Sequence, residues 1–320
     1  MFGLGSSRAV RGLWATAIAL AAGAATAVAA PVAVADTSAP PTLNGAWAPL
    51  SRCPVDDPAM LAADGVDTSA LCLASASASG SITLGNTTAT TGASDLQFGL
   101  LNDRGTFSII APSGGAVLAA PVQIPGGLLG LMCPSNIPLV SEICAGLVDG
   151  DLNAVTGTLE PAGDPSEFNL AAGLSAGVPI LTLPVKIHLR NPFLGSNCYV
   201  GSNSDPIVLH PANLSVPQGS IVAFDQDGTL DPDGDMGYVK VTGTGQRDDS
   251  FAVPGANGCG LAGLLDLAVN LKVGLPSPAG NNSLVLNAPT TYLGGFLSPA
   301  AFAPTEGQQL ADRWHAAVVG

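Results

Sequence analysis

Positive charge is scarce in this chain. Lysine and arginine together number 10 against 24 aspartates and glutamates, so the formal net charge is −14. A surface this acidic repels phosphate backbones and disfavours docking on anionic lipid. We therefore expect no nucleic-acid partner. The simplest reason for the acidity is that it keeps an apolar protein soluble.

Histidine and aromatic residues are also few. The three histidines, His188, His210 and His315, have no second ligand at metal-binding spacing, and no CxxC pair occurs. These gaps disfavour a zinc site and thiol redox chemistry. Three tryptophans and three tyrosines are too few to indicate a carbohydrate-binding aromatic platform. Calcium apart, we expect no cofactor.

Long helices are disfavoured because the chain contains 40 glycines and 26 prolines. The clearest pattern is an alternation from Leu181 to Leu189, in which the odd-numbered residues are apolar. Pro184 predicts an edge position or a bulge for this strand. Its polar face carries Lys186, His188 and Arg190, which we expect to pair with the protein's own carboxylates. The fold is predicted to be mainly β, with antiparallel sandwich-like or barrel-like sheets, two or three short capping helices and a C-terminal helix.

After residue 35 the chain has no apolar run long enough to span a membrane. Before it, Arg8 and Arg11 precede an uncharged stretch, Leu13 to Ala35, which ends in Ala-Val-Ala. This arrangement predicts that residues 1–35 are a cleaved signal peptide. We expect a secreted or extracellular protein, whether free or associated with the cell wall, without a transmembrane span after cleavage.

All six cysteines follow the predicted signal peptide. Exported proteins meet oxidising conditions, so an even number of cysteines predicts disulfides. We expect each cysteine to pair with its neighbour in sequence, which gives Cys53–Cys72, Cys133–Cys144 and Cys198–Cys259. The two short loops would each contribute about 3 kcal/mol in the chain-entropy model.

The chain after the signal peptide is expected to have three parts. A Pro-rich lead-in covers residues 36–50, followed by a β-rich half with a short helical cap, 51–164, and a β-rich half ending in a helix, 165–320. The two halves could also form one continuous domain. We expect helices at Ala59–Ala63, Pro138–Val148, Cys259–Leu267 and, after a capping box at Thr305, Glu306–Val318. Strands are expected at Glu167–Leu174 and Val269–Val273, among others, and a turn or edge strand at Ser75–Gly80.

One motif matches the G-x-S-x-G pattern of serine hydrolases, with Ser175 at its centre. That chemistry needs a serine on a sharp strand-to-helix turn and a histidine base, for which His315 is the candidate. The context argues against it, because a predicted strand follows Gly177 and no His-Gly-Gly oxyanion segment occurs. We favour a turn of small residues and retain a secreted serine hydrolase as the alternative.

The sharpest local signal is an acidic, glycine-containing stretch between residues 225 and 235. Its five carboxylates resemble the DxDG repeats of extracellular calcium-binding loops: Asp225, Asp227, Asp231, Asp233 and Asp235. The spacing departs from the EF-hand, whose first ligand position would fall on Ala223 or Thr229. Asp-Gly pairs also form hairpin turns, so the same residues predict an acidic loop without metal. A calcium-dependent adhesin is therefore a further alternative.

The segment Trp47-Ala-Pro-Leu-Ser-Arg-Cys-Pro and the segment from Cys133 to Leu139 resemble conserved secreted proteins of high-GC Gram-positive bacteria. The function of that group is unknown, so the resemblance implies a bacterial cell-envelope or extracellular location and no activity. Because no acid, base, nucleophile and metal residues converge, we expect a non-catalytic role. The sequence thus predicts a disulfide-stabilised extracellular binding or structural protein, whose partner would be an extracellular ligand or cell-surface component.

Overall fold

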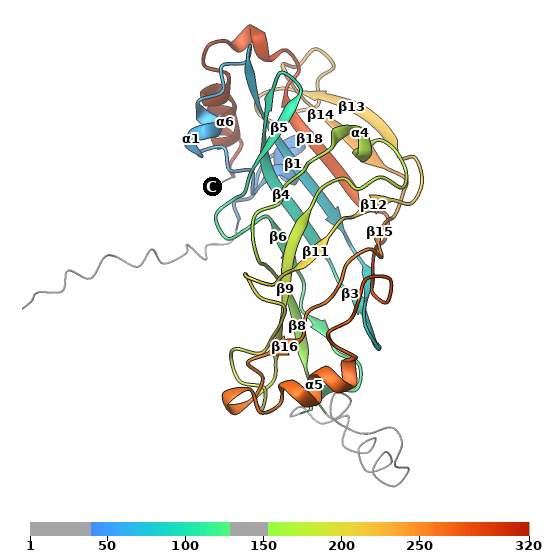
Figure 1. Ribbon diagram of the computed structural model, residues 1–320. Helices are drawn as coiled ribbons and strands as arrows, with labels where there is room; N and C mark the ends of the chain where they lie inside the picture. Colours follow the sequence, from blue (N-terminus) through green and yellow to red (C-terminus); the bar gives the residue numbers. More distant parts are fainter. Residues whose placement is uncertain (1–39, 129–152, 320) are drawn as a thin grey trace, which may run out of the picture. The chain divides into compact units, whose positions relative to one another are not determined.

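The computed structural model describes residues 40–128 and 153–319 (Figure 1). The predicted signal peptide, the Cys133–Cys144 pair and the predicted helix Pro138–Val148 lie outside these ranges. The prediction of a mainly β fold is confirmed. Antiparallel sheets pack in a sandwich-like arrangement with short helices and a C-terminal helix.

The largest described sheet has seven strands in the order β13-β14-β18-β1-β4-β5, and β6 also pairs with β4. Its strands are β1 (Thr68–Ser77), β4 (Ser94–Asp103), β5 (Thr106–Ile110), β6 (Val117–Ala119), β13 (Gln218–Phe224), β14 (Met236–Thr242) and β18 (Thr290–Phe296). Strands from the beginning and the end of the chain therefore lie side by side at its centre (Figure 1).

Two further sheets complete the strand framework. The six-stranded sheet has the order β16-β10-β9-β8-β7, with β11 also paired to β9, and the five-stranded sheet has the order β12-β15-β17-β2-β3. The first comprises β7 (Val122–Gln123), β8 (Thr156–Pro161), β9 (Leu183–Arg190), β10 (Tyr199–Val200), β11 (Ile207–Leu209) and β16 (Ala256–Asn257). The second comprises β2 (Gly80–Leu84), β3 (Thr87–Thr91), β12 (Ala212–Asn213), β15 (Gln246–Asp248) and β17 (Ser283–Leu286). Each of the three sheets combines strands from both sides of residue 164.

Strand β1 shows how the seven-stranded sheet is covered on both faces. Leu71 and Leu73 pack into a core that the other two sheets share. Ala70, Cys72 and Ala74 alternate with them and belong to a second core. Because successive side chains of a strand point to opposite faces, this sequence buries both sides of the sheet.

Short helices cover the second of these faces. They are η1 (Gly45–Leu50), α1 (Pro58–Leu61) and the C-terminal helix α6 (Glu306–Ala316). Trp47, Met60, Leu310 and Trp314 from these helices fill the second core. The remaining described helices are α4 (Leu170–Gly173), η2 (Leu261–Gly263), α5 (Asp266–Val273) and η3 (Pro299–Phe302). Among the described helices, none has the length and apolar character needed to cross a bilayer.

Two predicted strands are wrong. Glu167–Leu174 contains helix α4, because the Asn169 side chain accepts a hydrogen bond from the Ala172 amide and caps a helical turn. Val269–Val273 is the end of α5, which stops where Gly274 adopts a left-handed conformation. The helix predicted at Cys259–Leu267 is replaced by η2 and the start of α5.

Two predictions about strand position are also wrong. The segment Ser75–Gly80 was predicted to be a turn or an edge strand. Its first three residues instead belong to β1, which continues to Ser77 and lies between β4 and β18. Strand β9 is an interior strand despite Pro184. The Pro184 carbonyl accepts a hydrogen bond from the Ala162 amide at 3.1 Å, one residue after β8 ends. Proline has no amide hydrogen to donate in return, but at this point the pairing of β9 with β8 is already ending, so no bond within the two strands is lost.

Two of the predicted disulfides are present. Cys53–Cys72 joins the segment after η1 to β1, with Cα atoms 5.6 Å apart. Cys198–Cys259 joins the residue before β10 to the loop after β16, with Cα atoms 4.1 Å apart. No cysteine in the described ranges is free. The fold is therefore disulfide-stabilised.

Candidate functional site

An apolar cavity of about 150 Å³ lies where the three sheets meet. The five-stranded sheet contributes Ile82 and Leu284 to its wall, and the six-stranded sheet contributes Leu159 and Ile187. The seven-stranded sheet closes it through residues such as Leu96. An apolar cavity of this size stays dry and accepts small apolar molecules.

Short side chains on β3 explain why this space is unfilled. Thr87, Ala89 and Thr91 share one face of the strand, and all three line the cavity. Thr88 and Thr90 lie on the opposite face and are exposed. A larger residue at the buried Ala89 position would fill the volume, so the sequence itself keeps the cavity open.

A second cavity of about 160 Å³ adjoins the first. Its wall includes Phe168 and Leu181 on one side and Val239 and Leu293 of the seven-stranded sheet on the other. Five residues line both cavities: Ser75, Leu96, Pro211, Gln246 and Pro289. The two cavities therefore share part of their wall.

The cavity walls carry almost no charge. Neither lining includes a lysine, arginine or histidine, and the one acid, Asp95, forms an ion pair with Arg52 at 3.0 Å. At the junction, the Gln246 amide donates to the Asn213 side chain. The hydroxyl oxygen of Thr91 is buried without a hydrogen-bond partner. The space thus suits an uncharged molecule.

The structure does not bring the hydrolase candidates together. The Ser175 hydroxyl donates to the Ala172 carbonyl of its own helical turn at 3.3 Å. His315 lies on α6, where its Nε2 contacts Asp56 Oδ1 at 2.7 Å. Helix α4 packs on the core between the sheets, whereas α6 packs on the second core. No serine–histidine contact involving Ser175 exists in this arrangement.

The acidic loop is held by its own backbone. Asp227 Oδ1 accepts from the Thr229 amide, and Asp231 Oδ1 accepts from the Asp233 amide, both at 2.9 Å. Backbone hydrogen bonds lower the pKa of Asp227. Asp235 faces Arg313 of α6 at 3.4 Å. Neither these carboxylates with Asp225 nor any other His, Cys, Asp or Glu group in the described ranges forms a metal-binding cluster of three.

The same loop packs tightly on η1. The Gly228 carbonyl accepts from the Ala46 amide at 2.9 Å, and the Gln226 carbonyl accepts from Trp47 Nε1 at 3.1 Å. A Cβ atom on Gly45, where φ is +47°, would lie 2.2 Å from the Gly228 carbonyl oxygen. The Asp-Gly pair thus permits a close approach that covers the second core.

Sequence reasoning missed the buried carboxyl of Glu306 at the start of α6. Its Oε2 accepts from the Ala70 amide of β1 at 3.0 Å, and its Oε1 has no hydrogen-bond partner. Burial raises the pKa of Glu306 to about 7; the Ala70 bond opposes this and Asp64 adds to it. The predicted capping box does not form, because Thr305 makes no capping bond. Nothing in the local sequence distinguishes this glutamate from an exposed one.

The basic side chains of β9, which are Lys186, His188 and Arg190, pair largely as predicted. His188 Nδ1 contacts Glu160 Oε1 at 3.0 Å, and Arg190 lies 3.7 Å from the same oxygen. Lys186 instead donates to Asn203 and lies over the Tyr199 ring. Two of the three side chains therefore use a carboxylate of the protein itself.

The geometry therefore offers an apolar compartment, and the one ionisable group among its described lining residues, Asp95, is paired with Arg52. The sequence predicted the inward face of β9, which forms part of the wall, but not the cavity. A scan against protein-family models, a search of curated proteins and a search of solved structures each find no match for this chain.

Proposed function

We propose that this chain is a secreted, non-catalytic binding protein that holds a neutral apolar molecule in the two adjoining cavities. The observation that carries this function is the pair of adjoining apolar cavities between the sheets, whose walls carry almost no charge. The combined volume reaches the lower end of small-molecule sites, about 300 Å³. The apolar stretch before Ala35 and the two disulfides support export.

The wall chemistry selects for an uncharged ligand. An ionised carboxylate placed in this space would lose its hydration and find no cation among the lining residues. An uncharged ester or alcohol loses less hydration than an ionised carboxylate does. A long-chain ester is therefore a better ligand than the corresponding fatty acid.

Binding of the neutral dye Nile red tests this function directly. We expect wild-type protein to give a saturable fluorescence increase and Ala89→Phe to abolish most of it, because the ring would occupy the first cavity. Thr90→Phe is the matched control, since Thr90 is exposed on the outer face of the same strand. It should bind the dye like the wild type.

Competition then tests the preference for neutral ligands. Methyl laurate should displace Nile red at a lower concentration than laurate. Equal displacement by the two, or dye binding by folded Ala89→Phe at wild-type affinity, would contradict the proposed function. Circular dichroism of each variant establishes that it is folded.

A further inference from the structure

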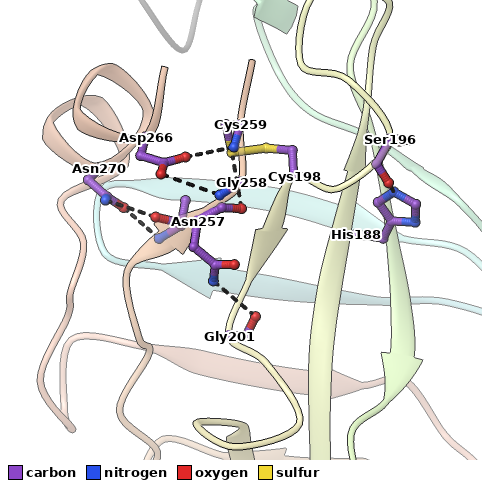
Figure 2. The surroundings of a disulfide bond; sticks show 10 residues. His188, Ser196, Cys198, Gly201, Asn257, Gly258, Cys259, Asp266 and Asn270 are labelled. Atoms are coloured by element: carbon purple, nitrogen blue, oxygen red, sulfur yellow. Dashed lines mark hydrogen bonds between the residues drawn. A yellow bond between two sulfur atoms is a disulfide. The ribbon is translucent and has the colours of Figure 1, made fainter. Parts of the chain in front are cut away.

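Helix α5 turns two polar side chains inward, which an ordinary surface helix would turn to solvent. Asp266 and Asn270 point toward the protein, beside the Cys198–Cys259 disulfide (Figure 2). Asp266 Oδ1 accepts from the Cys259 amide at 2.7 Å. Asn270 Oδ1 accepts from the Ala256 amide at 2.6 Å, while its Nδ2 donates to the Ala256 carbonyl at 3.2 Å. These bonds fix which face of the helix is turned outward.

The outward face consists of leucines. Between 69% and 84% of each of four leucines is exposed: Leu261, Leu264, Leu267 and Leu271. Leu267 and Leu271 lie one turn apart on α5, whereas Leu261 begins η2 and Leu264 lies between η2 and α5. We call these four residues the leucine patch. Most soluble helices turn such residues inward, so this leucine patch needs a partner.

The leucine patch and the cavity share one helix. Val273 of α5 is buried and lines the first cavity together with Leu84 and Ile124. Val269, one turn earlier, packs into the core between the sheets. Helix α5 therefore forms part of the cavity wall on its inner side and carries the leucines on its outer side.

The charge of the protein limits which partners the leucine patch can bind. Asp266 is engaged with backbone amides of the protein, so its carboxylate is not part of the outward patch. The net charge of −14 disfavours anionic lipid. An uncharged lipid surface fits both the leucines and the chemistry of the cavity, because it is also a source of neutral apolar molecules.

We infer that the leucine patch docks on a neutral lipid surface, from which the apolar ligand enters the cavity behind α5. This inference rests on the proposed function for the identity of the ligand. The docking itself depends only on the patch. The polar anchors Asp266 and Asn270, with the disulfide, hold the leucines outward in the absence of lipid.

Flotation with phosphatidylcholine vesicles tests the docking. We expect the wild type to float with the vesicles and Leu267→Gln/Leu271→Gln to bind at least about tenfold more weakly, since two leucines lose their apolar contact. Both leucines are exposed, so the double variant should fold. Leu214→Gln/Leu230→Gln is the matched control because these leucines are 57% and 67% exposed and lie elsewhere in the fold. It should float like the wild type.

The same variants separate this inference from the proposed function. In vesicle-free buffer, Leu267→Gln/Leu271→Gln should bind Nile red with wild-type affinity. If the wild type fails to float, or if both double variants float equally, docking on neutral lipid is wrong while dye binding still stands on its own. If sedimentation velocity shows a wild-type dimer that the Leu267→Gln/Leu271→Gln variant alone loses, the patch is a contact between copies and the inference is overturned.

Discussion

Filling the first cavity with a larger side chain should stabilise the ligand-free protein. Ala89→Leu adds three carbon atoms beside a space of about 150 Å³. At about 0.8 kcal/mol per buried methylene, the gain in unfolding free energy is about 2 kcal/mol. For a chain of this size, that corresponds to a rise of about 4 °C in Tm. Thermal unfolding followed by circular dichroism measures the change.

Thr90→Leu is the control for this substitution. It adds a leucine to the same strand on the exposed side, so its Tm should change by less than about 1 °C. A fall in Tm for Ala89→Leu, with Thr90→Leu unchanged, would show that the added carbons clash with the wall. The reasoning that Ala89 borders usable free volume would then be refuted.

Three other measurements test features outside the cavity. Stability due to neutral Glu306 should be complete below pH 4.5 and should be lost as the pH rises through about 7. We expect urea unfolding to show a total loss of about 3 kcal/mol in the free energy of unfolding over this pH range. Glu306→Gln should remove most of this pH dependence. Replacing both Cys198 and Cys259 with serine should cost about 4 kcal/mol, because that bridge spans 61 residues; an unchanged urea midpoint would contradict this. Calcium should leave Tm unchanged, because the carboxylates of the acidic loop do not converge on one point in the described structure; a calcium-dependent rise would support the metal hypothesis.

The elements that the sequence predicted well are those with a complete local signal. The alternation from Leu181 to Leu189 correctly identified the buried face of β9. A helix was predicted at Ala59–Ala63, where α1 lies, and the local sequence starts it: the Asp57 side chain accepts a hydrogen bond from the Ala59 amide, and Pro58 occupies the first turn. In both cases neighbouring residues alone decide the conformation.

Strand β18 had no such signal, although it lies at the centre of the largest described sheet. Its Gly294 and Gly295 weaken the strand pattern. The structure shows why they are small: a Cβ on Gly294 would lie 3.0 Å from Leu50, and one on Gly295 would lie 2.8 Å from Leu71. Contacts with residues more than 200 positions away thus determine this strand.

The candidate site was hidden for a related reason. A cavity is space left between strands that are distant in sequence, so no local pattern reports it. The leucines of α5 have the spacing of a buried helix face. The Cys259 and Ala256 amides instead donate hydrogen bonds to Asp266 and Asn270, which turns the leucines outward. These contacts become visible only in three dimensions.

The pairing of β1 with β18 also constrains when the protein can fold. The Asn44 amide donates to the Ala317 carbonyl, and Leu43 forms a bridge with Val318, so both ends of the described chain close the same core. These contacts cannot form until the chain has been synthesised as far as Val318. Such high contact order slows folding, because the long intervening loop must be closed before these contacts can form.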